Sequence, residues 1–250
     1  MFELSSNLVT SSLAQWRGTR VRSNREHTGQ LLHLYDMEGC PFCRLVREAL
    51  TELNLNAVIY PCPKGGSRFR NRALELGGKA RFPLLVDPNR QEMLYESAAI
   101  VDYLQRHYGG DAKPVLRGRI GLFGKARSFA ASASRLGKGL YAKPAKRPER
   151  MLELYSFEAS PFSRPVRELL CELEIPYVIR NCGKSSAKDF LLPQLRDRLP
   201  MKYEPVSANR RSLLEETGRV AVPFLVDPNT GARLFESSAI RAYLIHQYQI

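Results

Sequence analysis

Two cysteines, Cys40 and Cys43, are separated by Pro41 and Phe42, and their spacing is the strongest chemical signal in the chain. Residues three apart on a helix are neighbours, so two thiols placed there can form an intramolecular disulfide or resolve a mixed one. A thiolate at a helix start is stabilised by unpaired backbone amides and the positive end of the helix dipole. We therefore expect Cys40 to be a catalytic nucleophile with a lowered pKa and Cys43 to be the resolving thiol.

Two other interpretations of this pair are open. A structural zinc site normally has four ligands, and no second cysteine pair or histidine at ligand spacing completes one, so we expect no metal. Alternatively, both cysteines are inert and buried. The proline between them and their place at a helix start favour exposure instead.

The sequence around the cysteine pair recurs later in the chain. Residues 39–44 (GCPFCR) match residues 159–164 (ASPFSR), at an offset of 120, and residues 83–89 (PLLVDPN) match residues 223–229 (PFLVDPN), at an offset of 140. Two homologous units are therefore present, the second with a 20-residue insertion.

Hydrophobic periodicity and turn signals predict the same elements in each unit. Pro41 suits the first turn of a helix, Gly77-Gly78 closes a second helix, and Asp87-Pro88-Asn89 is typical of a tight turn. For the first unit we expect strand (31–35), helix (from 41), strand (57–60), helix (69–76), two antiparallel strands (83–86 and 93–95) and a helix capped by Ser97 (97–108).

A mixed sheet of this order, with a Cys-Pro-Phe-Cys turn entering its first helix, resembles the thioredoxin fold, closest to glutaredoxins and the N-terminal domain of glutathione transferases. The resemblance implies an α/β protein with two thioredoxin-like domains, each a mixed four-stranded sheet with helices. The tandem arrangement departs from the usual transferase, whose second domain is wholly helical. The expected organisation is an N-terminal amphipathic extension (1–30), a glutaredoxin-like domain (31–110), a basic, partly helical linker (111–150) and a second transferase-like domain (151–250).

The resemblance also implies a glutathione site in the first unit. In this family the proline of Phe82-Pro83 is cis and faces the active-site cysteine, and the preceding residue offers its backbone to the cysteinyl part of glutathione. Ser97 can donate to a carboxylate and Glu96 can pair with an ammonium, which suits the γ-glutamyl end, although simple helix capping explains Ser97 equally. The expected glutathione-binding residues are Phe42, Phe82, Pro83, Glu96 and Ser97.

The second unit has Ser160 and Ser163 in place of the two thiols, so it cannot carry out dithiol exchange. It is either degenerate or, as serines do in several transferase classes, uses Ser160 to stabilise a glutathione thiolate. The residues of this possible second glutathione site are Ser160, Val222, Pro223, Glu236 and Ser237.

The net charge of +13 is concentrated in one segment, because residues 113–150 hold eleven Lys and Arg against one acid. A whole-chain nucleic-acid binder is therefore a weaker interpretation. Helical spacing of apolar residues predicts a basic amphipathic helix here that packs between the two domains, with an anionic membrane surface as the alternative partner. Its apolar positions are Ile120, Leu122, Phe123, Ala126, Phe129, Ala130, Ala133, Leu136 and Leu140.

The N-terminal extension has a similar apolar stripe, and we expect a helix docked on the body through it. Serines and arginines there also faintly resemble an organelle transit peptide. Five irregularly spaced cysteines fit a reducing compartment, so we expect a cytoplasmic protein, with organellar targeting left open. The stripe consists of Phe2, Leu4, Leu8, Val9, Leu13 and Trp16.

Together, the motifs predict a glutathione-linked thiol–disulfide oxidoreductase that acts on a disulfide or mixed-disulfide substrate, with glutathione as co-substrate. The alternatives are a glutathione transferase or related isomerase, and a noncatalytic adaptor that binds glutathione or peptides. Relatives of this fold that bind an iron–sulfur cluster or haem through such a cysteine are an analogy only.

Overall fold

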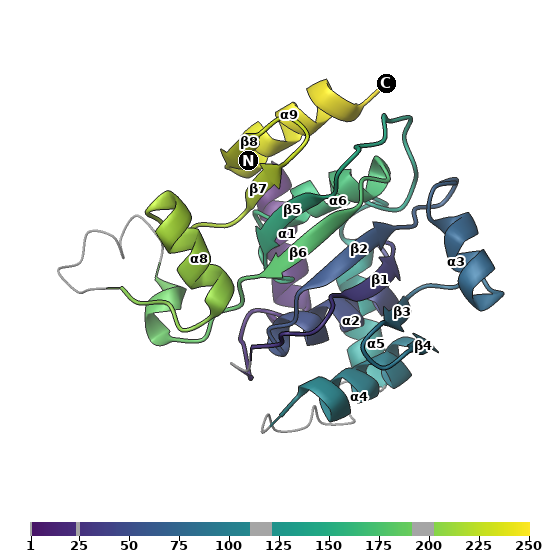
Figure 1. The fold of residues 1–250 in the computed structure, drawn as a ribbon, viewed down its shortest axis with the longest axis horizontal. Coiled ribbons are helices and arrows are strands. Elements are labelled where there is room, and N and C mark those ends of the chain that lie inside the picture. Colours follow the sequence, from purple (N-terminus) through teal and green to yellow (C-terminus); the bar gives the residue numbers. More distant parts are fainter. Residues whose placement is uncertain (1, 24–25, 111–121, 192–202) are drawn as a thin grey trace.

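The structure is a computed structural model and describes residues 2–23, 26–110, 122–191 and 203–250 (Figure 1). A leading helix, α1 (Phe2–Leu13), precedes the first repeat. This repeat contains β1 (Leu32–Asp36), α2 (Pro41–Glu52), β2 (Ala57–Pro61), α3 (Arg70–Gly77), β3 (Leu84–Asp87), β4 (Glu92–Tyr95) and α4 (Ser97–Tyr108).

The second repeat follows the same order. Helix α5 (Leu122–Ala133) precedes it, as α1 precedes the first repeat. The repeat itself contains β5 (Leu152–Ser156), α6 (Arg164–Glu172), β6 (Tyr177–Asn181), the 3-10 helix η2 (Ala187–Phe190), α8 (Ala208–Thr217), β7 (Phe224–Asp227), β8 (Ala232–Phe235) and α9 (Ser237–Tyr248).

Each repeat forms the predicted thioredoxin-like sheet. Strands β1 and β2 are parallel and are connected through α2, β3 runs antiparallel to β1, and β4 runs antiparallel to β3. The second repeat reproduces these pairings with β5, β6, β7 and β8. The expected α/β architecture with two such units is confirmed.

The two sheets join edge to edge into one eight-stranded sheet, in the order β4-β3-β1-β2-β6-β5-β7-β8. Strands β2 and β6 pair antiparallel, with Val58 opposite Val178, its own equivalent in the repeat. This is the self-complementary pairing of a two-fold symmetric dimer, here within one chain. The join leaves neither repeat with an open inner edge.

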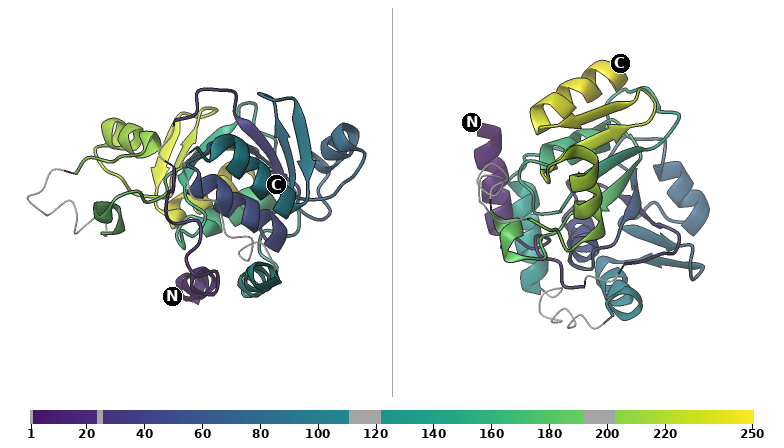
Figure 2. Two further views of the ribbon diagram at one scale, coloured as in Figure 1. Left: turned by 90° about the horizontal axis from the view of Figure 1, so that it is seen from below. Right: turned by 60° about the vertical axis from the view of Figure 1, so that its left-hand side comes forward.

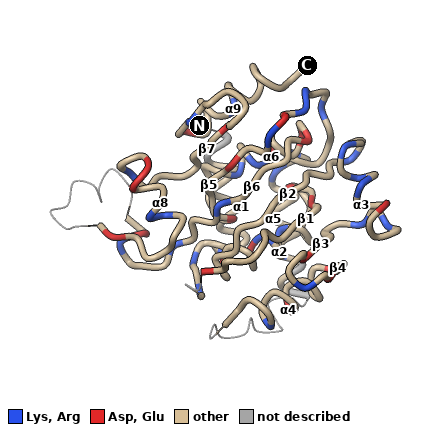
Figure 3. The backbone as a smooth tube through the Cα atoms, viewed as in Figure 1, with Lys and Arg blue, Asp and Glu red and all other residues tan. Residues whose placement is uncertain are grey.

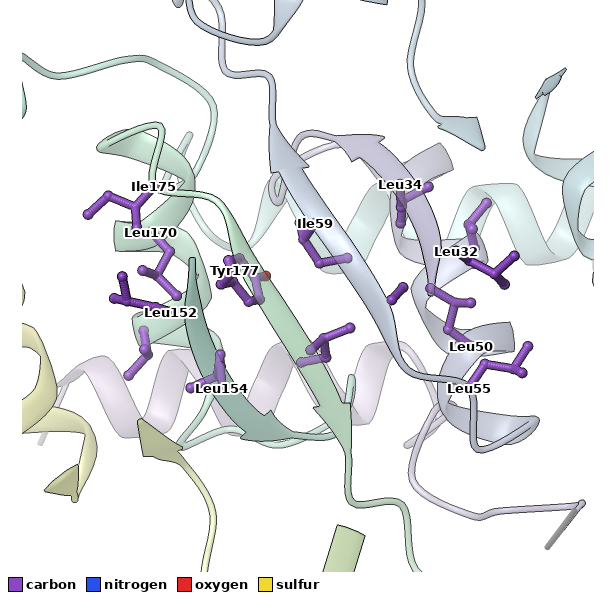
Figure 4. Close-up of a cluster of buried hydrophobic side chains, with 14 of the residues drawn as sticks. Leu32, Leu34, Leu50, Leu55, Ile59, Leu152, Leu154, Leu170, Ile175 and Tyr177 are labelled. Atoms are coloured by element: carbon purple, nitrogen blue, oxygen red, sulfur yellow. The ribbon is translucent and has the colours of Figure 1, made fainter. Parts of the chain in front are cut away.

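One hydrophobic core serves both repeats (Figure 4). Side chains alternate between the two faces of a strand, so Leu34 belongs to the shared core while Tyr35 belongs to a smaller cluster beside α3. The shared core includes Leu50 and Ile59 of the first repeat and Leu170 and Tyr177 of the second.

The two leading helices are exchanged between the repeats. Gly139, which follows α5, accepts a hydrogen bond from the Gly39 amide at 3.2 Å, and Gly18, which follows α1, accepts one from the Ala159 amide at 3.2 Å. Each leading helix therefore covers the motif turn of the other repeat. Helices α1 and α5 lie side by side at one side of the molecule (Figure 2).

Both helices form where the apolar patterns predict them, but the predicted packing faces are wrong. Leu136 is 85% exposed and Phe129 50% exposed, so this apolar side does not pack between the two domains. Leu8, Val9 and Leu13 on α1, and Trp16 in the turn after it, are also exposed. The body is bound instead through small hydroxyl side chains, because Ser11 and Ser128 hydrogen-bond to it. Ile120, at the start of the second pattern, lies outside the described residues, and so do the side chains of Leu122, Phe123, Phe2 and Leu4.

Candidate functional site

Cys40 lies in the turn between β1 and α2. Its amide donates to the Met37 carbonyl at 2.9 Å, and its carbonyl accepts from the Arg44 amide at 3.1 Å, which begins the hydrogen-bond pattern of α2. Pro41 occupies the first helical position, where no amide donor is needed. The exposure that we expected from the proline and the helix start is not seen, because both cysteines are buried, Cys40 at 7% exposed and Cys43 at 0%.

The local hydrogen bonds give the two thiols opposite acidities. The thiol of Cys43 hydrogen-bonds to the Cys40 sulfur and, together with the amides of Cys43 and Phe42, lowers the pKa of Cys40 to about 7, although burial opposes the shift. Burial and the neighbouring Cys40 raise the pKa of Cys43 well above its ordinary value. Near neutral pH this arrangement favours a Cys40 thiolate beside a protonated Cys43.

The cis-proline motif lies at the same end of the sheet as the cysteine turn. Tyr35, the last residue but one of β1, pairs with Leu84, the first residue of β3, so Phe82-Pro83 enters β3 beside the loop that leads to Cys40. The Phe82-Pro83 peptide bond is cis, as is its counterpart Val222-Pro223. The expectation drawn from family resemblance is confirmed for both bonds.

Glu96 and Ser97 form the start of α4, but Ser97 is not the cap that we expected. The helix begins at Ser97, Glu96 occupies the N-cap position, and no side chain caps the helix. Glu96 is exposed and has φ of 67°, and Glu236 has φ of 66° at the equivalent position. A strained backbone shared by two non-glycine residues is typical of a position held for a ligand rather than for helix stability.

Arg70, at the start of α3, is a site residue that sequence reasoning missed. Its guanidinium lies 4.9 Å from the centre of the Phe82 ring, and its Nη1 donates to the Cys62 carbonyl at 3.0 Å. It places a cation beside the cis-proline motif, and a guanidinium is the group that pairs best with a carboxylate. The three arginines at 68, 70 and 72 were a sequence signal for such a cation.

Helix α5 covers the cysteine turn, a role not expected of the linker. Ser128 Oγ donates to the Pro41 carbonyl at 2.6 Å, and the Phe129 ring meets Phe42 edge to face at 5.3 Å. This cover helps explain why Cys40 has a small exposed surface while Phe42 remains 36% exposed.

In the second repeat, the two serines hydrogen-bond to each other. Ser160 Oγ accepts from the Ser163 hydroxyl at 2.9 Å and from the Ser163 amide at 3.1 Å, and Ser160 is 1% exposed. Helix α1 closes the turn from outside, because Ser11 Oγ donates to the Ala159 carbonyl at 2.8 Å. Both interpretations of the second repeat, degenerate or glutathione-binding, stay open.

Val222 and Ser237 of the possible second site are partly exposed, Glu236 is exposed and Pro223 is buried, as Pro83 is. The second repeat thus keeps these residues at equivalent positions but has no thiol in its motif turn.

The remaining cysteines are packing residues. Cys62 and Cys182 are fully buried in the two smaller hydrophobic clusters, and burial raises the pKa of Cys182 to about 12. Cys171 is also buried, with a pKa raised by burial. Within the described ranges, no group of three His, Cys, Asp or Glu side chains is arranged to hold a metal ion.

Comparison with known proteins agrees with the fold and the motif positions. The family model for the glutathione S-transferase N-terminal domain matches two stretches, residues 34–112 and 154–249, which include both motif turns, both cis-proline bonds and both Glu-Ser pairs. No curated protein matches the chain. The two matched stretches make up more than half of the sequence, and the chain therefore belongs to the glutathione S-transferase N-terminal domain family, of which it holds two tandem copies.

Proposed function

We propose that the protein is a glutathione-linked thiol–disulfide oxidoreductase with a single reaction centre at Cys40. The observation that carries the proposal is the pair of opposite acidities at the start of α2, where Cys40 has a pKa of about 7 and Cys43 is held protonated. A reactive thiolate next to a resolving thiol is the arrangement that disulfide exchange needs.

The first step is attack on a disulfide. The Cys40 thiolate attacks one sulfur of a glutathione mixed disulfide, the S–S bond breaks, and the substrate leaves as a thiolate that takes a proton from water. Cys40 is then joined to glutathione in a new mixed disulfide.

Two routes can return the enzyme to its reduced state. In the first route, a second glutathione thiolate attacks the glutathione sulfur of this mixed disulfide. The Cys40 thiolate is released, and the two glutathione molecules leave as glutathione disulfide, which accounts for the two electrons. Alternatively, Cys43 loses its proton and attacks Cys40, which releases glutathione and leaves a Cys40–Cys43 disulfide for glutathione to reduce.

The surrounding residues support a glutathione seat. The backbone at Phe82, before the cis-proline, would pair with the cysteinyl residue, and Glu96 with Ser97 would bind the γ-glutamyl end. Arg70 would bind the glycine carboxylate, and Phe42 would border the tripeptide at the mouth. Ser97 is buried at the start of α4, and Tyr95, two residues before it, pairs with Leu84, the residue after Pro83. The start of this helix therefore lies beside the cis-proline motif, which suits a carboxylate.

The test is reduction of a glutathionylated peptide by the full chain, coupled to glutathione reductase. We expect turnover in the wild type, loss of it in Cys40→Ser, and retained turnover in Cys43→Ser, because glutathione alone can close the cycle. Ser160→Ala serves as the matched control in the second repeat and should not change the rate. Undiminished turnover in Cys40→Ser would reject the proposal.

The same preparations separate the alternatives. A transferase would conjugate glutathione to an electrophile and would keep that activity in Cys40→Ser. An adaptor would bind glutathione without turning over any disulfide.

A further inference from the structure

Helix α1 carries its apolar side chains on the wrong face for a helix exposed to water. The face buried against the body is polar or small and consists of Asn7, Thr10, Ser11 and Ala14. The outward face is apolar, and the exposed fractions of Leu8, Val9, Leu13 and Trp16 are 40%, 52%, 41% and 42%. A surface helix of a globular protein shows the opposite pattern.

Helix α5 and the turn after it repeat this inversion. Ser128 and Ala131 are buried, whereas Phe129 is 50% exposed and Leu136 is 85% exposed. The alanines on the outward side are also exposed, namely Ala126, Ala130 and Ala133.

The two helices contact each other through small polar groups. The hydroxyls of Thr10 and Ser134 lie 2.6 Å apart, and Ser6 Oγ donates to the Ser134 carbonyl at 3.3 Å. Small and hydroxyl-bearing residues at a helix–helix contact are typical of helices packed in an apolar medium. We call the outward surface the apolar ridge, and it consists of Leu8, Val9, Leu13, Trp16, Phe129 and Leu136.

The sequence around the ridge is basic and free of acids. Residues 4–25 and 112–148 hold fourteen Lys and Arg and no Asp or Glu, which leaves 24 basic and 25 acidic residues in the rest of the chain. The whole net charge of +13 thus belongs to the two segments that contain α1 and α5. Four of these cations pair with acids of the body, namely Arg17, Arg22, Arg135 and Lys143 with Glu48, Glu52, Glu168 and Glu172. Elsewhere, as around α3 and α8, both signs are mixed (Figure 3).

We propose that the apolar ridge docks on the surface of an anionic membrane, with α1 and α5 lying in the plane of the bilayer. Apolar side chains would enter the interface while flanking Lys and Arg meet acidic headgroups. In the part of the chain that the structure describes, no helix is long and apolar enough to cross a membrane, which fits helices that lie on it.

Charge and polarity disfavour the other occupants. A second copy of the chain would bring two basic, acid-free surfaces together, which like charges oppose. A nucleic acid would pair with the positive charge but would leave the apolar ridge against a polar phosphate backbone. An anionic lipid surface binds both the apolar ridge and the basic residues around it.

Docking would also place the reaction centre near the lipid. Ser128 and Phe129, on α5, contact Pro41 and Phe42 beside Cys40. The membrane would then border the entrance to the cysteine, whatever reaction takes place there.

The experiment uses Trp16, the single tryptophan of the chain, as its probe. The full chain is titrated with phosphatidylcholine vesicles and with vesicles in which about a third of the lipid is phosphatidylglycerol, as anionic surfaces recruit basic segments. We expect a blue shift of Trp16 emission and co-sedimentation with the anionic vesicles, both weakened by high salt. The triple variant Val9→Ser/Leu13→Ser/Leu136→Ser should lower the partition coefficient at least about tenfold, because each apolar carbon removed weakens insertion.

The matched control is Leu74→Ser/Met93→Ser/Ile245→Ser, which alters three apolar residues away from the ridge that are 48%, 42% and 43% exposed. It should bind like the wild type. Thermal unfolding verifies that both triple variants fold. No Trp16 shift with anionic vesicles, or equal binding to neutral ones, would overturn the proposal. The proposal would also be overturned if light scattering without lipid showed a dimer in which Trp16 is buried. The same holds if a short DNA duplex, instead of lipid, buried Trp16.

Discussion

Arg47 and Glu158 belong to different repeats, yet the Arg47 Nε donates to Glu158 Oε2 at 3.0 Å in the buried centre of the molecule. The equivalent residues make the same bond in the opposite direction between the repeats. Arg167, of the second repeat, donates through Nη2 to Oε1 of Glu38, of the first repeat, at 3.0 Å. Arg47 also bonds to Asp36, at the end of β1. The two repeats are therefore held together by crossed ion pairs as well as by the β2–β6 join, and we expect them to unfold as one unit.

Glu158→Gln should lower the free energy of unfolding by about 3 to 5 kcal/mol, because it leaves two buried guanidiniums short of a counter-charge. Burial raises the pKa of Glu158, but Arg167, Arg47 and Arg44 outweigh it and lower the pKa to about 2. Its stabilisation is therefore present above the unfolded pKa near 4.5 and is lost as the pH falls toward 2. Urea unfolding of the wild type and of Glu158→Gln should therefore show that the difference between their free energies of unfolding becomes smaller as the pH falls through this range.

The control for this variant is Glu153→Gln, which breaks the Glu153–Arg180 pair whose side chains are 33% and 28% exposed. A surface pair of this kind contributes less than about 1 kcal/mol. Equal losses in the two variants would contradict a central role for the buried pair.

The acidity of Cys40 predicts a pH profile. Only the thiolate is alkylated, so the rate of iodoacetamide reaction should rise with pH to a midpoint of about 7 and then level off. Cys43→Ala removes the hydrogen bond that lowers this pKa most, so the midpoint should move up toward that of an ordinary thiol, near 8.5. The same midpoint in both proteins would show that Cys43 does not set the acidity of Cys40.

The cover over Cys40 predicts a change in access without a change in chemistry. Ser128→Ala removes the hydrogen bond to Pro41 and should make local opening about 1 kcal/mol easier, which speeds alkylation of Cys40 about fivefold. Ser11→Ala removes the matching bond to Ala159 on the other repeat and should leave the rate unchanged. Equal acceleration by both variants would indicate general loosening instead.

Arg70 predicts a selective effect on glutathione. Arg70→Gln keeps polarity but removes the charge, and it should raise the KM for glutathione about tenfold with little change in kcat, as for loss of a charge-assisted hydrogen bond. Arg72→Gln is the control on the same helix, since Arg72 pairs with Glu75 at the surface. A fall in kcat with unchanged KM would place Arg70 in a different role.

Much of the fold was predictable because the two copies of the repeat share residues, such as proline, that restrict the backbone geometry. The matching of PLLVDPN with PFLVDPN, and of the two motif turns, determined the strand order within each unit. The join between β2 and β6 could not be predicted in the same way, because both are short, buried apolar strands whose outer partners leave no mark in their sequence.

The leading helices show where periodicity misleads. Their spacing located both helices, but the rule that the apolar face packs inward assumes water on the other side. That the two leading helices are equivalent was also not evident, because their sequences share little. The clearest common feature is a glycine after each helix, Gly18 and Gly139, with φ of 71° and 70°, values that favour glycine. The position of α5 over Cys40 follows from this exchange and is not encoded near the cysteines.

Because the leading helices are exchanged, the chain cannot be divided between its repeats without loss. A fragment ending at residue 110 would keep Cys40 and Cys43 but would lose the Ser128 cover, and it would retain α1, which belongs over the serine turn. Without β6, its strand β2 would become an open sheet edge, whose unpaired backbone groups promote aggregation. Either half alone would therefore lack contacts that the full chain makes, and we expect the thiol-bearing repeat to need the thiol-free one in order to fold.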